Sequence, residues 1–228
     1  MKLTGVLLSM LILLVACTSG DKKLHELSPE QLSEVNAGRI ASFNSDELNP
    51  TEYVSWIRNA RNGLLQEKTM EELVFTAQYK PYPYIACVEE KKKEITSTSL
   101  AQKITELDGM QYIDLRIALK DGGTELLKHN LSSRQQYDER VNYFAFGMQK
   151  DISLVDGTDT IPCSLFHFER AYDVTPYSTF LLGFSIGKKK GMSDKTLIYQ
   201  DKTFHKGTIK LSFRREDLLN TPKLKTTS

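Results

Sequence analysis

The sequence predicts an α+β protein in which N-terminal short helices pack on a mainly antiparallel β-sandwich. Apolar residues recur with a period near 3.6 up to residue 64 and with a period of 2 from residue 73 onward. Seven strand-like runs are separated by turn residues, without the regular strand-helix alternation of an α/β fold. We therefore expect a helical segment over 28–69, a sandwich-like domain with an inserted helix over 70–214, and a polar tail over 215–228.

Two segments near the N-terminus have the pattern of capped helices. Ser28-Pro29 supplies a cap and a proline at the first helical position, which predicts a helix over 29–37. Asn49-Pro50 repeats this pattern, and the second helix is expected to end at Asn62-Gly63. Trp56 lies beside the apolar face of this second helix and is expected to anchor the core rather than to stack on a ligand. That face is formed by Tyr53, Ile57, Ala60 and Leu64.

The segments that follow alternate apolar and polar residues. We expect one strand over 73–79 and another over 113–119, with a helix over 97–107 between them and a further short helix over 132–141. The tail from Asn220 is polar and is expected to be frayed. The other expected strands cover 142–148, 161–169, 177–186, 196–199 and 208–213.

The first seventeen residues have the form of an export signal. Lys2 gives a positive start, and the apolar run that follows is too short to span a bilayer comfortably. The run ends in Leu14-Val15-Ala16-Cys17, which resembles the lipobox of bacterial lipoproteins, L-[AV]-[AG]-C. The resemblance implies that residues 1–16 are a signal peptide removed before Cys17. It also implies a diacylglyceryl group on the Cys17 thiol and usually an acyl chain such as palmitate on the new amino terminus.

The same resemblance implies a location and a first partner. The lipid anchor would attach the protein to a membrane of the cell envelope, with residues 17–27 as a short lipidated tether. Because Thr18 rather than Asp follows the lipidated residue, the analogy with enteric lipoproteins favours the outer membrane, facing the periplasm. Display on the cell surface stays open.

The charge balance argues against a nucleic-acid partner. The chain has 30 basic and 29 acidic residues, and removal of Lys2 with the leader leaves 29 of each. Proteins that bind nucleic acids normally have a basic excess. We therefore expect no nucleic acid among the partners.

Cys87 and Cys163 are the two cysteines left after lipidation of Cys17. An oxidising periplasm permits them to form a disulfide, and two buried free thiols are the alternative. Since no C-x-x-C motif is present, neither a zinc cage nor a thioredoxin-like redox site is predicted.

The densest polar cluster lies on the expected strand over 161–169 and just beyond it. On a strand, His167 and Glu169 point to one face and the neighbouring phenylalanines to the other. The pair could begin a metal site, but no spacing indicates a third ligand, whether from His129, His205 or an acid. We favour a hydrogen-bonded or ion-paired group on a partly exposed face and predict no metal, cofactor or catalytic residue. The possible polar site comprises His167, Glu169, Arg170 and Asp173.

An aromatic stretch follows the first expected strand. Tyr79, Tyr82 and Tyr84 alternate with two prolines within a few residues, which makes this part of the chain stiff. The stretch could form a binding surface or cover the edge of a sheet. Both interpretations stay open from the sequence.

No catalytic or nucleotide-binding motif indicates an enzyme. We expect a membrane-anchored envelope lipoprotein that acts as a non-enzymatic binding or assembly module, with an envelope protein or glycan as its partner. The alternative is an envelope hydrolase that uses a carboxylate pair or a His-Glu metal site. A recessed pocket with two carboxylates or three metal ligands would favour the hydrolase, and an exposed aromatic sheet face would favour the binding module.

Overall fold

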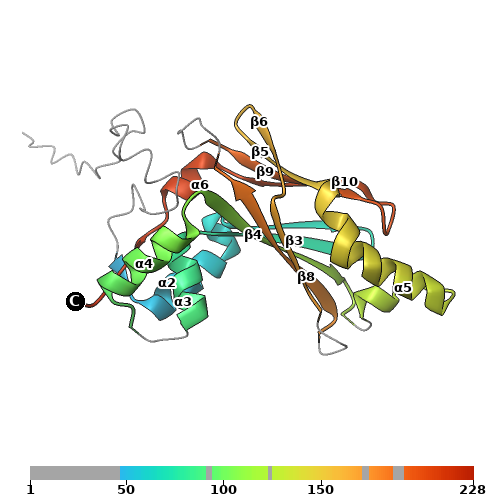
Figure 1. Ribbon diagram of the computed structural model, residues 1–228, viewed down its shortest axis with the longest axis horizontal. Helices are drawn as coiled ribbons and strands as arrows, with labels where there is room; N and C mark the ends of the chain where they lie inside the picture. The colour runs from blue at the N-terminus through green and yellow to red at the C-terminus, as the bar shows by residue number, and fades with distance from the viewer. Residues whose placement is uncertain (1–46, 91–93, 123–124, 171–174, 187–192) are drawn as a thin grey trace, which may run out of the picture.

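The computed structural model describes residues 47–90, 94–122, 125–170, 175–186 and 193–228 (Figure 1). The expected helix over 29–37, the expected lipidation site Cys17 with the expected tether over 17–27, and Asp173 lie outside these residues. In the part of the chain that the structure describes, no helix is both long and apolar enough to cross a membrane.

Two antiparallel sheets confirm the α+β class (Figure 1). The larger sheet has the order β2-β3-β4-β8-β7, and the smaller has the order β10-β9-β5-β6. The larger sheet contains β2 (Leu65–Met70), β3 (Leu73–Lys80), β4 (Met110–Leu119), β7 (Leu165–Glu169) and β8 (Tyr177–Ser185). The smaller sheet contains β5 (Ile152–Asp156), β6 (Asp159–Pro162), β9 (Lys195–Asp201) and β10 (Gly207–Phe213).

The core contains aromatic contacts between the two sheets. The rings of Phe75 on β3 and Tyr199 on β9 have centroids 6.4 Å apart, and those of Tyr79 and Phe213 are 5.8 Å apart. The alternation on β3 produces these contacts, because every second side chain, from Leu73 to Tyr79, is buried. Burial of such large rings supplies much of the driving force for folding.

Several helices gather at the end of the molecule where the described chain begins (Figure 1). In α2 (Pro50–Arg58), Asn49 and Glu52 form the expected reciprocal capping box. The α-helix ends before the expected Asn62-Gly63, because the extended Asn59 caps a separate 3-10 turn, η2 (Ala60–Asn62). The other helices of this group are α3 (Tyr82–Glu90), α4 (Ser97–Leu107) and α6 (Arg215–Leu219).

The prediction of a strand over 142–148 is wrong, because this segment is helical. The helix α5 (Arg134–Asn142) continues into a π-helix, η4 (Tyr143–Gly147), and a 3-10 turn, η5 (Met148–Asp151). Phe144 and Met148 are both fully buried at i and i+4, so the apolar spacing is helical rather than alternating. Gly147 is required here, because a Cβ would lie 2.7 Å from Cδ2 of Tyr143.

The single strand expected over 161–169 is two strands that belong to different sheets. The N–H of Cys163 donates to the carbonyl of Ile152 in the smaller sheet, whereas the N–H of Ser164 donates to the carbonyl of Gly183 in the larger sheet. The chain therefore changes sheets between β6 and β7. Within these two sheets, β2 and β5 were not expected at all.

The prediction of a frayed C-terminal tail is also wrong. The strand β11 (Lys223–Leu224) pairs in parallel with β1 (Glu47–Leu48). Beyond it, the N–H of Thr227 donates to the carbonyl of Ile95 at 2.9 Å, and its own carbonyl accepts the N–H of Ser97. Backbone hydrogen bonds hold this tail in place. The polar composition of the tail does not predict these bonds, because they involve the main chain.

Candidate functional site

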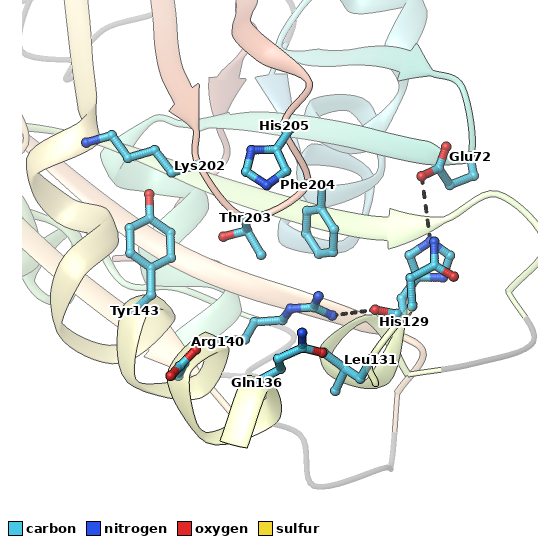
Figure 2. A pocket seen from close by; sticks show the side chains of 12 residues that line it. Glu72, His129, Leu131, Gln136, Arg140, Tyr143, Lys202, Thr203, Phe204 and His205 are labelled. Carbon is cyan, nitrogen blue, oxygen red and sulfur yellow. Dashed lines mark hydrogen bonds and ion pairs between the residues drawn. The ribbon is translucent and has the colours of Figure 1, made fainter. Parts of the chain in front are cut away.

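A pocket of about 520 Å³ lies where α5 meets three connecting segments. Figure 2 shows its walls. Glu72 comes from the β2–β3 turn, His129 from the turn after η3 (Leu126–Lys128), and residues 202–205 from the β9–β10 loop. Arg140 and Tyr143 come from the end of α5 and the start of the π-helix. We call this the loop pocket.

Asp201 holds the β9–β10 loop in a fixed shape. This buried carboxylate accepts hydrogen bonds from the N–H groups of Thr203, Phe204 and Lys206 at 2.9 to 3.1 Å. The hydroxyl of Tyr199 donates to it as well, at 3.2 Å. Because its backbone donors are satisfied from within, the loop presents its side chains to the pocket from a defined scaffold.

Arg140 lies at the centre of the loop pocket (Figure 2). Its Nη1 donates to the carbonyls of Leu126, Leu127 and His129, at 3.3, 3.1 and 2.7 Å. Its Cζ lies 4.8 Å from the centroid of the Phe204 ring, in a cation-π contact. Burial lowers the pKa of the guanidinium below its usual range, although the negative charge of Asp201 acts in the opposite direction. Among the described residues, no carboxylate lies within ion-pairing distance of Arg140.

An ionic chain joins three segments at one side of the pocket. Lys206 Nζ lies 2.5 Å from a Glu71 carboxylate oxygen and 3.1 Å from Oε1 of Glu72. The same Oε1 lies 3.6 Å from Nε2 of His129, an atom that is buried without a hydrogen-bond partner. A backbone hydrogen bond, followed by the Lys206 contact, lowers the pKa of Glu72. Glu72 is therefore a stable anion that is already matched by a cation.

A second ion pair forms the opposite wall. Asp151 accepts a hydrogen bond from the Tyr143 hydroxyl at 2.8 Å and pairs with Lys202 at 2.5 Å. Burial, followed by the bond to Asp151, raises the pKa of Tyr143 well above its usual range. The phenol therefore stays protonated and acts as a donor.

The two carboxylates of the loop pocket are poorly placed for acid-base chemistry. Glu72 has a lowered pKa, whereas a general acid needs a raised one. Glu139 is exposed and accepts a hydrogen bond from Gln135. Arg140 forms no ion pair with a described carboxylate, and the charge of Asp201 acts on it only from a greater distance, so the arrangement favours binding of an anionic group.

The residues predicted as a polar site lie elsewhere. His167 and Glu169 are exposed on β7, with the half-buried Phe166 and Phe168 on its opposite face. Arg170 is also exposed, and its Nη2 donates to the Tyr137 hydroxyl at 3.2 Å. These residues do not line the loop pocket. Within the described ranges, no group of three His, Cys, Asp or Glu side chains could hold a metal ion.

The aromatic stretch does not form an exposed surface, because Tyr79, Tyr82 and Tyr84 are all buried, each at most 4% exposed, although Tyr84 lines a pocket described below. The last two belong to α3 rather than to a stiff extended segment. Tyr82 donates its hydroxyl to the carbonyl of Met110 at 2.6 Å, and Tyr84 accepts a hydrogen bond from Nε of Arg58 at 2.9 Å. All three rings are therefore core residues, and the hydroxyls of Tyr82 and Tyr84 each have a hydrogen-bond partner.

The possible disulfide is also contradicted, since Cys87 and Cys163 are free buried thiols. Cys87 lies in α3, whereas Cys163 lies at the junction of β6 and β7, where its Sγ donates to the carbonyl of Leu165 at 3.1 Å. Burial raises the pKa of each thiol to about 11.

A second hollow, of about 390 Å³, lies over the outer face of the larger sheet. Arg58, Arg116 and Asp114 are among its lining residues. Asp114 pairs with Lys80 at 3.0 Å, and its pKa is raised, chiefly by burial and also by the charge of Glu169. Glu169, which belongs to the polar site predicted from the sequence, thus acts electrostatically on a residue of this hollow. We call the hollow the outer-face pocket.

No family model, curated protein or solved structure matches this chain. Its function is therefore inferred from the N-terminal sequence motif and from the two pockets.

Proposed function

We propose that this protein is an envelope lipoprotein, anchored through Cys17, that acts as a non-enzymatic binding module for an acidic peptide segment of a partner protein. The leader motif supports the anchor and favours the outer membrane, facing the periplasm. The loop pocket supports the binding role, with a volume of about 520 Å³ that suits a few residues of a chain.

Arg140 is the observation that carries the binding proposal. Removing a guanidinium from water is costly unless its charge is matched. Its Nη1 donates to three carbonyl oxygens, but no described carboxylate forms an ion pair with it, and the charge of Asp201 acts on it only from beyond that distance. A ligand carboxylate would supply the missing charge and accept hydrogen bonds from the remaining guanidinium nitrogens.

The other groups of the pocket favour a peptide as the source of that carboxylate. Asn130 and Gln136 line the pocket with side-chain amides, which match the N–H and C=O groups of a peptide backbone. Phe204, held under Arg140, adds an apolar surface for a side chain.

The binding proposal is tested by calorimetry on the full-length lipoprotein in detergent. The probe is the tripeptide Ala-Glu-Ala with a free carboxyl terminus, compared with an Ala-Gln-Ala amide. We expect the acidic peptide alone to bind, and the Arg140→Gln substitution to weaken that binding at least tenfold. Arg134→Gln on the same helix is the matched control, because the Arg134 side chain is 91% exposed and pairs with Asp138. Equal binding of both peptides, or an equal loss of affinity in Arg140→Gln and Arg134→Gln, would contradict the proposal.

The anchor is tested separately by labelling cells with a radioactive fatty acid. We expect the native protein to be labelled and to fractionate with membranes, and the Cys17→Ala protein to lose both properties. A labelled, membrane-bound Cys17→Ala protein would refute the anchor without affecting the binding result.

We also infer that the two sheets form a β-sandwich. The ring contacts between β3 and the strands β9 and β10 support face-to-face packing of their apolar sides. This arrangement leaves the opposite face of the larger sheet available for the outer-face pocket.

A further inference from the structure

The strand register places a row of hydrogen-bonding side chains across the outer face of the larger sheet. Arg116 on β4 is directly opposite Thr76 on β3 and directly opposite Thr179 on β8. Directly paired residues on neighbouring strands point to the same face, with Cβ atoms roughly 5 Å apart. Two hydroxyls therefore flank one guanidinium, and all three residues line the outer-face pocket.

A second guanidinium enters the same pocket from a helix. Arg58, the last residue of α2, donates its Nε to the Tyr84 hydroxyl at 2.9 Å. Arg116 is held in a similar way, with its Cζ 4.2 Å from the centroid of the Tyr177 ring. These contacts with tyrosines restrict both side chains and leave guanidinium N–H groups available to a ligand.

Neither arginine forms an ion pair with a described carboxylate. The nearby Asp114 pairs with Lys80, and its charge acts on Arg116 from beyond ion-pairing distance. Glu67 and Glu169 belong to the same cross-strand row as Arg116, but each is two strands away from it, and neither forms an ion pair with it. The pocket thus contains two guanidinium groups that form no ion pair with a described carboxylate, beside an aspartate that is paired with Lys80.

We propose that the outer-face pocket binds a phosphate monoester, either as a soluble ester or as a lipid headgroup. A phosphate monoester near neutral pH carries close to two negative charges and offers three strong acceptor oxygens. Two guanidinium groups match this charge, and the hydroxyls of Thr76 and Thr179 add neutral donors around the same oxygens. This site is separate from the loop pocket and rests on different residues.

The test is calorimetric titration of the full-length lipoprotein in detergent with glycerol 3-phosphate. We expect measurable binding that Arg116→Gln and Arg58→Gln each weaken at least tenfold. The control Arg134→Gln, which removes an exposed arginine with the same change of charge, should leave the affinity within twofold. The melting temperature of each variant shows whether it is folded, and the double substitution Thr76→Val/Thr179→Val offers a second test that leaves every charge in place.

Dioctanoyl phosphatidic acid and dioctanoyl phosphatidylcholine distinguish the two sources of phosphate. Tighter binding of phosphatidic acid than of glycerol 3-phosphate would assign the site to a lipid headgroup, whereas equal binding would assign it to a soluble ester. Phosphatidylcholine, a diester with a bulky cation, should bind neither the native protein nor the variants. Absence of monoester binding, or the same loss of affinity in Arg134→Gln as in Arg116→Gln, would overturn the proposal.

Discussion

Substitution of Lys195 should expose the energetic importance of a buried ion pair. Lys195 and Asp156 are directly opposite each other on β9 and β5, and Nζ lies 2.7 Å from Oδ2. Asp156 also accepts hydrogen bonds from Ser193 at 2.5 Å and from Gln111 at 2.9 Å. The lysine side chain is 2% exposed and the aspartate side chain 16%.

The expected magnitude follows from this burial. Removing one partner of a buried ion pair costs about 3 to 5 kcal/mol, because the other charge is left unmatched. The partial exposure of Asp156 places Lys195→Met near the lower end, at about 3 kcal/mol. Methionine keeps most of the apolar stem, so lost packing contributes little to this figure. In the double variant Lys195→Met/Asp156→Leu, most of the loss should be recovered, because no charge is left buried.

Urea denaturation at pH 7, followed by the fluorescence of Trp56, measures these changes. The control is Arg134→Met, since Arg134 also pairs with an aspartate, Asp138, but the two side chains are 91% and 61% exposed. An exposed pair contributes at most about 1 kcal/mol, so the control should change the free energy of unfolding only slightly. If Lys195→Met costs no more than this control, or if the double variant is as unstable as the single one, the reasoning is refuted.

Three further predictions concern acid stability, the thiols and the packing between the sheets. Burial alone would raise the pKa of Asp156, but Lys195 and the hydrogen bonds together lower it below its ordinary value. The free energy of unfolding should therefore fall as the pH drops below about 4, and Asp156→Asn should flatten this dependence; a parallel decline in both proteins would count against it. Cys87 and Cys163, with pKa values of about 11, should react with a thiol reagent at pH 8 only after denaturation, and rapid labelling of the folded protein would contradict their burial. A double-mutant cycle on Tyr79 and Phe213 should give a coupling energy of about 0.5 to 1.5 kcal/mol, and a value near zero would argue against ring contact between the sheets.

Local patterns in the sequence account for the elements that were predicted well. The capping box at Asn49 and the proline after it fix the start of α2, and the apolar spacing identifies α4 over Ser97–Leu107. Strict alternation of apolar and polar residues identifies β3 and β4, because each of these strands buries one face. These signals lie within a single element, so they need no knowledge of the rest of the fold.

The elements that were missed depend on contacts between distant residues. The polar β2 forms because β3 provides a hydrogen-bonding edge, and β11 forms because β1 does so. The candidate sites were missed for the same reason. Arg116 fits the alternating pattern that predicts its strand, but the threonines that flank it lie on other strands. Arg140 belongs to a polar helix in which nothing in the local pattern distinguishes it from Arg134.

The π-helix connects the core to the loop pocket. Phe144 is fully buried, and its ring makes edge contacts with Phe180 and Phe168 at centroid distances of 5.1 and 5.7 Å. A third edge contact, at 6.4 Å, reaches Phe204 in the β9–β10 loop. Because Arg140 precedes Phe144 by four residues and lies over the same Phe204, the core ring fixes both the helix and the loop that hold the guanidinium. Wider turns of this kind often occur at functional sites, since they change the direction of side chains within a helix. The buried Phe144 ring therefore determines where the loop pocket presents the positive charge of Arg140.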